Sequence, residues 1–173
     1  MEQDNKKTES LFMEAYEQYN DAIFRYCLFQ VSNREQALDL AQDTFTKTWE
    51  YLVKGGKIDN VKAFLYRIAT NAIIDYRRKK KSGSLDALMD VGFDTQEQRP
   101  VDHESQSDGE IVRMTLAELD EKYRDVLTMR YINELSVKEI AESLGESENN
   151  VSVRIHRGIA KMKDLLEKRE LAL

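Results

Sequence analysis

The segment from Ser136 to about Lys163 carries side chains that can read the edges of DNA bases. Its residues predict a short helix that a capping box of Ser136 and Glu139 opens and Gly145 ends, and a second helix that Ser147 caps. On the outward face of the second helix, Asn can pair with adenine and Arg with guanine through two hydrogen bonds each, and Val can contact a thymine methyl group. The candidate DNA contacts are Ser147, Asn149, Asn150, Val153, Arg154, His156, Arg157 and Lys161.

An ordinary α-hairpin with a solvated basic face is the alternative for this segment. The stretch from Asn149 to Lys163 contains four basic residues and no acid, whereas a solvated helix face usually mixes the two signs. The pattern therefore favours a helix-turn-helix, in which the second helix enters the major groove of duplex DNA.

A second basic segment runs from Lys62 to Lys81 and holds seven basic residues against one acid, Asp75. Its outer helical face mixes cations, an amide and an aliphatic side chain, a mixture that suits separated DNA strands because unstacked bases need phosphate partners and apolar platforms. A basic helix end that only terminates a domain is the alternative. The residues predicted on or beside this face are Ala63, Tyr66, Arg67, Thr70, Asn71, Ile74, Arg77 and Arg78.

Charge is segregated along the chain. The sequence has 26 Lys and Arg against 32 Asp and Glu, a net charge of −6, which alone would argue against a polyanionic partner. Between the two basic segments, however, residues 82–110 hold eight acids against Arg99, a local charge of −7. Two basic segments in an acidic chain indicate two contacts with one polyanion.

Apolar residues recur at helical spacing in four stretches before the helix-turn-helix. These stretches are residues 8–31, 35–53, 60–81 and 111–131. Asp59 or Asn60 can cap the third of them. Residues 82–108 lack such a period and predict a linker. The predicted fold is all-α, with a three- to four-helix bundle and a helix-turn-helix domain joined by a flexible acidic linker.

The helix predicted over residues 8–31 carries more aromatic side chains than one buried face can hold, which predicts a surface for a partner. These side chains are Tyr16, Tyr19, Phe24, Tyr26 and Phe29. Trp49 lies on the apolar period of the next helix, and we expect it in the core.

Composition excludes several other classes of protein. The single Cys27 cannot form an internal disulfide, and His103 and His156 make no zinc-binding cluster, so neither metal nor cofactor is expected. The sequence has no Gly-rich phosphate loop and no nucleophile elbow, which gives an enzyme little support. No apolar stretch approaches the ~18 residues of a membrane helix, and we expect a cytoplasmic protein.

Two stretches resemble bacterial sigma factors. The sequence AFLYRIATNAIIDYRRKKK over residues 63–81 is similar to sigma region two, and LDEKYRDVLTMRYINELSVKEIAESLGESENNVSVRIHRGIAKMKDLL over residues 119–166 is similar to region four. Their order, with an acidic linker between them, resembles the extracytoplasmic-function (ECF, RpoE-like) group of the sigma-70 family. The resemblance implies region two over residues 1–81, a linker over 82–108 and region four over 109–173.

The resemblance also implies functions. The chain would be a non-enzymatic subunit that binds the clamp and flap of core RNA polymerase, promoter DNA and an anti-sigma factor. The helix from Ser147 would read the minus-thirty-five element as duplex. Residues that would bind the clamp are Asp39, Gln42, Asp43, Thr46 and Lys47. Residues that would melt the minus-ten element are Lys57, Asn60, Phe64, Arg67, Asn71, Arg77 and Arg78.

A stand-alone helix-turn-helix regulator is the alternative function. Such a protein binds its operator without polymerase, usually as a symmetric dimer. The basic helix that ends at Lys81 argues against it, because a sensor or dimerisation domain does not require one.

Overall fold

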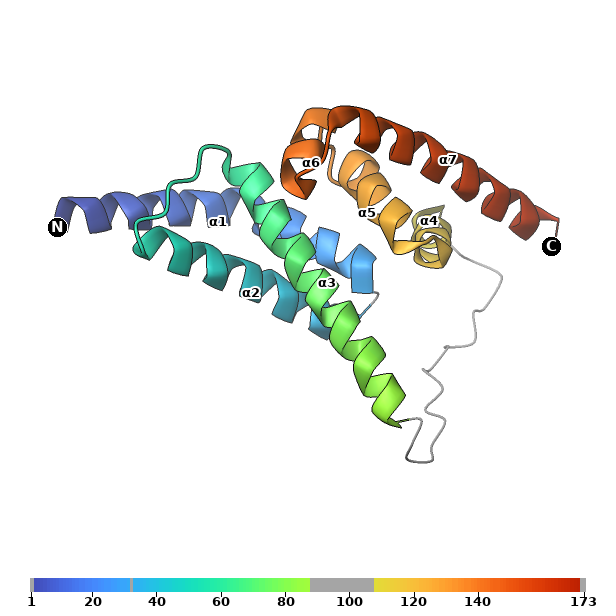
Figure 1. Ribbon diagram of the computed structural model, residues 1–173, viewed down its shortest axis with the longest axis horizontal. Coiled ribbons are helices and arrows are strands. Elements are labelled where there is room, and N and C mark those ends of the chain that lie inside the picture. The colour runs from blue at the N-terminus through green and yellow to red at the C-terminus, as the bar shows by residue number, and fades with distance from the viewer. Residues whose placement is uncertain (1, 32, 88–107, 172–173) are drawn as a thin grey trace.

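The computed structural model describes residues 2–31, 33–87 and 108–171, and the predicted linker falls mostly outside these residues. The N-terminal unit consists of α1 (Glu2–Val31), α2 (Arg34–Val53) and α3 (Val61–Ala87), which Figure 1 shows in blue to green. The predicted helices are present, and α3 continues beyond Lys81 to Ala87. None of the described helices has an apolar stretch long enough to cross a bilayer.

Side-chain caps fix where α2 and α3 begin. The Asn33 side chain accepts a hydrogen bond from the Gln36 N–H at 3.0 Å. Of the two caps considered for α3, Asn60 acts, because its Oδ1 accepts from the Ala63 N–H at 3.0 Å. Both bonds satisfy backbone donors that a helix start leaves without partners.

Large side chains from each helix fill the core of the N-terminal unit, among them Ile23 and Tyr26 of α1, Phe45 of α2 and Leu65 of α3. Cys27 is buried with them, and burial raises the pKa of its thiol to about 12, which leaves it a poor nucleophile.

The prediction that Ala63 and Thr70 lie on the outer face of α3 is wrong, since both are buried. The Thr70 hydroxyl lies 3.0 Å from the Tyr26 hydroxyl of α1 and donates to the Tyr66 carbonyl at 2.7 Å. Helix α3 contacts α1, α2 and a helix of the C-terminal half, so more than one stripe of its surface is covered.

The C-terminal unit contains α4 (Asp108–Glu118), α5 (Glu121–Leu127), a π-helical turn η1 (Thr128–Ile132), α6 (Val137–Leu144) and α7 (Glu148–Glu170). The single helical period predicted from Ile111 to Tyr131 is wrong. It breaks at Asp120, whose ψ of 140° is extended rather than helical, and it ends in the π-helical turn.

The predicted boundaries of the helix-turn-helix are confirmed. Ser136 and Glu139 form a reciprocal capping box at the start of α6, and Gly145 ends that helix with a left-handed φ of 66°. The Ser147 Oγ then accepts from the Asn150 N–H at 3.2 Å and starts α7. These caps fix where α6 begins and ends and where α7 begins.

Replacing Ser136 with Ala is expected to lower the free energy of unfolding by about 1 kcal/mol, because the Glu139 N–H then has no side-chain acceptor. Chemical denaturation of the full chain measures this change. Ser152→Ala, an exposed substitution in α7, is the control and should change stability by less than about 0.5 kcal/mol. Equal losses of stability in the two variants would contradict the role of the cap.

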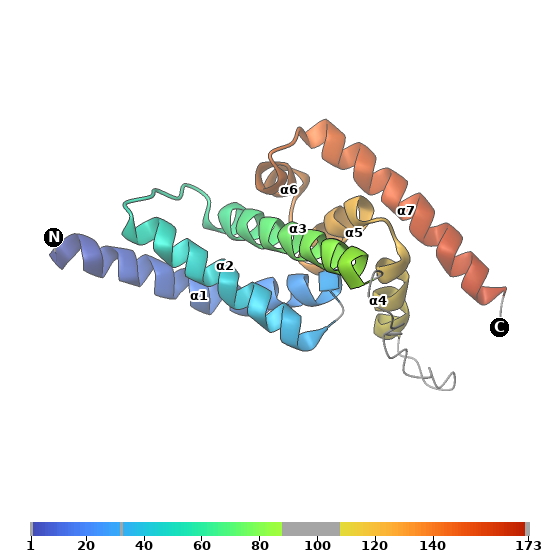
Figure 2. The same ribbon diagram turned by 60° about the horizontal axis from the view of Figure 1, so that its bottom comes forward.

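The two units pack against each other. Helix α6 lies beside the first turns of α3, while α4, α5 and η1 contact α1, and Figures 1 and 2 agree on this arrangement. The C-terminal end of α7 points away from the N-terminal unit in both views. The all-α, two-unit fold predicted from the sequence is confirmed.

Candidate nucleic-acid interface

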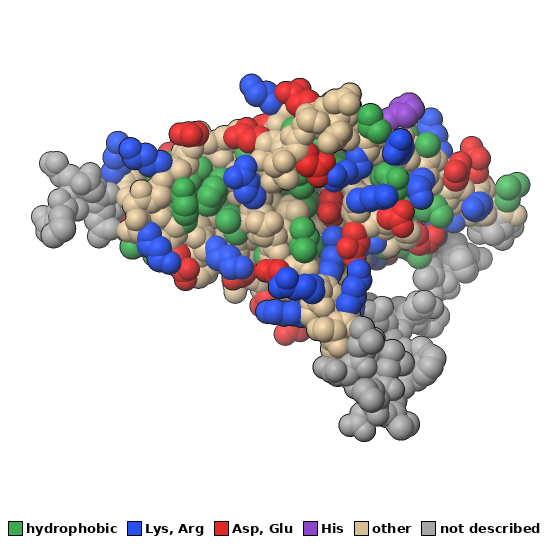
Figure 3. Space-filling view, viewed as in Figure 1, with side chains coloured by type: hydrophobic (Ala, Val, Ile, Leu, Met, Phe, Trp, Pro, Cys, Tyr) green, Lys and Arg blue, Asp and Glu red, His purple; other side chains and the backbone are tan. Residues whose placement is uncertain are grey.

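The outward face of α7 presents amide, hydroxyl and cationic side chains to solvent. The opposite face is buried through Val151, Ile155 and Gly158. A Cβ at Gly158 would lie 3.2 Å from the Leu127 side chain, so glycine allows α7 to lie close to α5. Figure 3 shows Lys and Arg side chains along this helix. The exposed candidate DNA contacts are Ser147, Asn149, Asn150, Val153, His156, Arg157 and Lys161.

Two of the candidate DNA-binding cations of α7 are held by acids of the same unit. Arg154 is half-buried and donates to both carboxylate oxygens of Glu146, with 2.5 Å to Oε2. Lys161 pairs with Asp120 at 3.3 Å and lies over the ring of Tyr123. Glu146 precedes the Ser147 cap, so it fixes Arg154 at the start of the outward face.

The candidate strand-separation residues lie on α3 and on the loop that precedes it. Lys57, Arg67, Asn71 and Arg78 are exposed, whereas Asn60 and Phe64 are half-buried. One residue that the sequence analysis missed shapes this loop: the Tyr51 hydroxyl donates to the Lys57 carbonyl at 3.2 Å. The Tyr51 and Phe64 rings lie 4.9 Å apart, and a Cβ at Gly56 would overlap the Tyr51 ring, so a larger residue there would displace this ring.

Arg77 differs from the other candidates because it is buried between the units. It donates to Gln30 Oε1 at 2.6 Å and to Asp125 Oδ1 at 3.3 Å, and Glu121 lies 3.8 Å away. Burial raises the pKa of Asp125 from its ordinary value, although the charge of Arg77 opposes the shift. In this arrangement Arg77 is not available to DNA, and its predicted contact stays a prediction.

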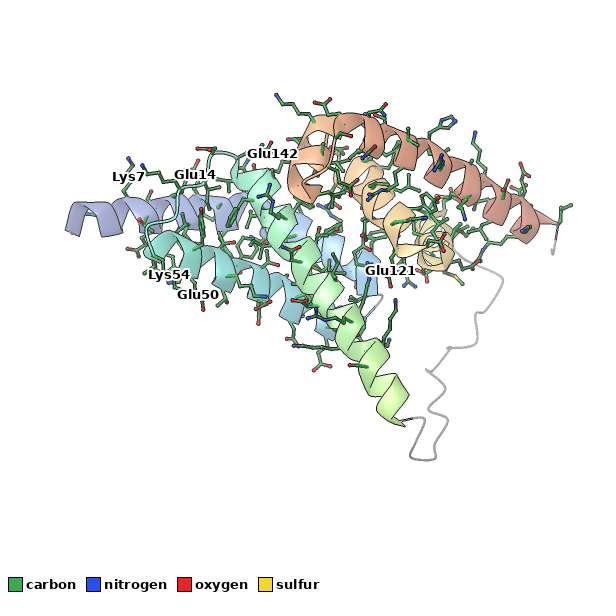
Figure 4. All side chains as sticks on the ribbon, viewed as in Figure 1. Lys7, Glu14, Glu50, Lys54, Glu121 and Glu142 are labelled. Atoms are coloured by element: carbon green, nitrogen blue, oxygen red, sulfur yellow. The ribbon has the colours of Figure 1, made fainter. Side chains whose placement is uncertain are left out.

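Acidic residues of α6 contact the start of α3. Glu142 accepts from the Asn60 amide at 3.1 Å through its side chain, and from Arg67 at 2.7 Å through its carbonyl. Lys62 pairs with Glu139 at 3.1 Å. Burial of Glu139 would raise the pKa of its carboxyl, but hydrogen bonds from Ser136 and Lys62 outweigh burial and lower it. Figure 4 shows Glu142 at this junction.

The sequence analysis missed the acidic half of this contact. Glu139 was expected only to cap the start of α6, and no contact between the units was expected for Glu121, Asp125 or Glu142. The available signal was Asp125, which lies among the apolar positions of α5 and is buried there. A buried acid requires a cationic partner, but the sequence does not indicate which one.

The candidate polymerase contacts lie on one side of α2. Asp43 and Lys47 form an ion pair at 2.7 Å one helical turn apart. Asp39, Gln42, Thr46 and Lys47 are exposed, and Asp43 is half-buried.

An apolar groove of about 530 Å³ adjoins this side, between α1 and α2. Met13 and Tyr16 are exposed there, and Tyr16 is the one exposed member of the aromatic residues named for a partner surface on this helix. Trp49 was expected in the core but is only half-buried and lines the groove, 5.2 Å from the Phe12 ring.

No group of His, Cys, Asp or Glu among the described residues has the arrangement of a metal site. Two clefts among the described residues have both cations and acids in their lining, with Arg67, Arg77 and Asp125 in one and Glu146, Arg154 and Arg157 in the other.

Family models match both units of the chain. The model described as Sigma-70 region 2 matches residues 15–83, and the model described as Sigma-70, region 4 matches residues 109–162. The ECF RNA polymerase sigma factor SigW of Bacillus subtilis is 30% identical, with 91% of this chain and 90% of SigW covered. The B. subtilis RNA polymerase sigma factor YlaC is 33% identical, covering 88% of this chain and 90% of YlaC.

Solved structures show the same fold. The sigma factor RpoE, in complex with the anti-sigma factor NepR from Bartonella quintana, has a TM-score of 0.73 and 21% identity, covering 90% of this chain and 96% of RpoE. CnrH, in complex with the cytosolic domain of CnrY, has a TM-score of 0.69 and 24% identity, covering 96% of this chain and 94% of CnrH.

The basic face of α3, the helix-turn-helix and the matched sequence regions together define a two-domain transcription initiation factor. The chain belongs to the extracytoplasmic-function sigma factors of the sigma-70 family. It binds core RNA polymerase and directs it to promoter DNA.

Proposed function

We propose that the exposed face of α7 reads the minus-thirty-five element as duplex DNA. The observation that carries this assignment is a face of amides and cations, opposite buried Val151 and Ile155, on a helix whose start is capped by Ser147. Its N-terminal residues would contact base edges, and Lys161 would contact phosphate.

The loop before α3 and the outer face of α3 melt the minus-ten element in this proposal. Lys57, Arg67 and Arg78 would hold phosphates, while Asn71 and Phe64 would contact unstacked bases. Tyr51 positions the loop through its contacts with Lys57 and Phe64. Asn60 and Arg77 would join this surface once they leave their partners in the C-terminal unit.

The division of the chain follows from these roles. Residues 1–81 would bind polymerase and the minus-ten element, and residues 109–173 would read the minus-thirty-five element. Residues 82–108 would be the linker between these two parts. The protein would act in the cytoplasm without enzymatic activity of its own. RpoE and CnrH were solved in complexes with NepR and CnrY, and we propose that an anti-sigma factor also binds this chain.

In this proposal, the side of α2 that carries Asp43 and Lys47 binds the polymerase clamp. Exchanging the charges of these two residues tests this assignment. In the variant Asp43→Lys/Lys47→Asp, the intrahelical pair is retained, so stability should change by only about 0.2–0.5 kcal/mol. The positions of the two charges that α2 presents to polymerase are exchanged, and we therefore expect the affinity for core polymerase to fall on the order of tenfold. Fluorescence anisotropy of the labelled full chain with core polymerase measures this affinity.

The matched control is Glu167→Lys/Lys168→Glu, a charge exchange at exposed positions near the C-terminal end of α7. It should leave polymerase binding unchanged. Unchanged affinity in the α2 variant, or an equal loss of affinity in both variants, would contradict the assignment of α2.

A further inference from the structure

The loop between α2 and α3, which Figure 1 shows as the thin teal segment that joins them, is hydrogen-bonded at both ends. At its start, the Gly55 N–H donates to the Leu52 carbonyl at 3.0 Å and the Gly56 N–H donates to the Tyr51 carbonyl at 2.9 Å. Gly55 has a left-handed φ of 84°, which glycine adopts without strain. At the other end, Asn60 caps α3. The loop is therefore fixed to both helices that flank it.

Tyr51, in the last turn of α2, supports the middle of this loop. Its hydroxyl donates to the Lys57 carbonyl at 3.2 Å, and its ring lies 4.9 Å from the Phe64 ring in the first turn of α3. The backbone of Gly56 lies against the same ring, since a Cβ there would overlap it. One side chain of α2 thus contacts the loop at two points and the start of α3 at a third.

Lys57 and Phe64 are the residues next to Tyr51 that the proposed function assigns to the melted strand, with a phosphate on Lys57 and a base on Phe64. Lys57 is exposed and Phe64 is half-buried. Two groups that are already in place bind a ligand more tightly than two groups on a loop that must first be ordered, because ordering costs free energy at the moment of binding. The contacts of Tyr51 remove this cost before a strand arrives.

A direct contact between Tyr51 and an unpaired base is the alternative role, since 41% of this residue is exposed. The contacts described above argue against it. The hydroxyl is already bonded to the loop backbone, and the ring is already packed against Gly56 and Phe64. A role in folding alone would require only the ring, whereas the hydroxyl reaches the loop and not the core.

We propose that Tyr51 is a positioning residue for the minus-ten strand, which holds Lys57 and Phe64 in one preformed site for a single unpaired nucleotide. Tyr51 acts through these two residues and does not touch the strand itself. The proposal rests on the role proposed above for this loop and α3 in melting. It makes strand binding depend on a hydroxyl group of α2.

Limited proteolysis of the full chain tests the preformed loop without DNA or polymerase. Trypsin cuts after lysine only where the backbone opens locally, so a supported loop is cut slowly after Lys57. Tyr51→Phe keeps the ring and removes only the hydroxyl, and cleavage after Lys57 should become about 2- to 10-fold faster. The matched control, Tyr131→Phe, changes an exposed tyrosine of the C-terminal unit and should leave this rate unchanged. An unchanged rate in Tyr51→Phe would overturn the proposal.

A double-mutant cycle tests whether Tyr51 acts through Lys57. The measurement is the affinity of the reconstituted holoenzyme for a labelled single-stranded minus-ten oligonucleotide. Lys57→Ala should weaken binding on the order of tenfold through loss of a phosphate contact, and Tyr51→Phe should weaken it about 2- to 10-fold. When Lys57 is already replaced, Tyr51→Phe should have a much smaller effect, because there is no longer a cation to misplace. Fully additive losses would overturn the proposal.

Gly56→Ala disturbs the same contacts from the side of the loop, because the added Cβ displaces the Tyr51 ring. It should weaken oligonucleotide binding at least as much as Tyr51→Phe does. In the Tyr51→Ala background it should have almost no further effect, because the ring is absent. Gly83→Ala in α3 is the matched control, since a Cβ there has no described atom within 4 Å. Equal effects of Gly56→Ala with and without the ring would contradict the proposal.

Two outcomes separate this inference from the proposed function. If Lys57→Ala leaves oligonucleotide binding unchanged, the proposed function of the loop is contradicted and the positioning role fails with it. If Lys57→Ala weakens binding but Tyr51→Phe does not, the positioning role alone is overturned. Affinity for core polymerase and for a duplex minus-thirty-five fragment should be the same in all these variants, because the substitutions lie outside α7 and the candidate polymerase contacts of α2.

Discussion

Removal of the Arg67, Asn71 and Arg78 side chains is expected to lower initiation from a duplex promoter on the order of a hundredfold or more. Each is exposed on α3, and each is assigned a phosphate or a base of the melted minus-ten strand. Hydrogen bonds to charged groups are worth about 1.5–3 kcal/mol each, so the loss of even two of them accounts for this factor. The measurement is run-off transcription by the reconstituted holoenzyme.

A template that is already unpaired over the minus-ten element separates melting from other defects. On this template, initiation by the variant that lacks all three side chains should recover to within a few-fold of that of the unmodified chain, because the free energy of strand separation is no longer required. Lys79→Ala/Lys80→Ala removes two neighbouring cations of α3 as the matched control and should have a much smaller effect. Equal losses of initiation on paired and unpaired templates would show that these residues do not act in melting.

Replacing Arg157 with Ala is expected to weaken recognition at one base pair of the minus-thirty-five element. Arg157 is exposed on the outward face of α7, whereas neighbouring Arg154 is held by Glu146. A bidentate contact to a base edge contributes about 1–3 kcal/mol of discrimination, or roughly 5- to 150-fold. Affinity of the holoenzyme for promoters carrying each single substitution in the element measures this change.

The contrast with Lys161 makes the assignment specific. Lys161→Ala removes a proposed phosphate contact and should weaken binding to all these promoters about equally, with a reduced dependence on salt. Arg157→Ala should remove the base preference at one position of the minus-thirty-five element and leave the preferences at the other positions unchanged. A uniform decrease in affinity with Arg157→Ala would place that residue on the phosphate backbone.

Local features of the sequence were sufficient to predict the helix-turn-helix. Ser136, Glu139, Gly145 and Ser147 act through neighbours only a few residues away, so their effects can be read from short stretches. The outward face of α7 followed from the helical period, because Val151 and Ile155 are buried as expected. The helical period alone did not reveal the break at Asp120, because the apolar residues on either side keep the same spacing.

The contact between the units could not be predicted in the same way. Arg77 and Asp125 are 48 residues apart and Asn60 and Glu142 are 82 apart, so no local period relates them. The same contact explains why Arg77, a predicted surface cation, is buried. The helical period of the α3 sequence predicts a single buried face. A helix that packs against several neighbours, as α3 does, buries residues on more than one face.

Run-off transcription with core polymerase, with and without the purified chain, tests directly whether the chain directs polymerase to a promoter. The template carries the region upstream of the gene for this protein. Start-specific transcripts are expected only when the chain is added. Binding of the chain to the same duplex without polymerase, with no transcript in its presence, would contradict this expectation and identify a stand-alone helix-turn-helix regulator.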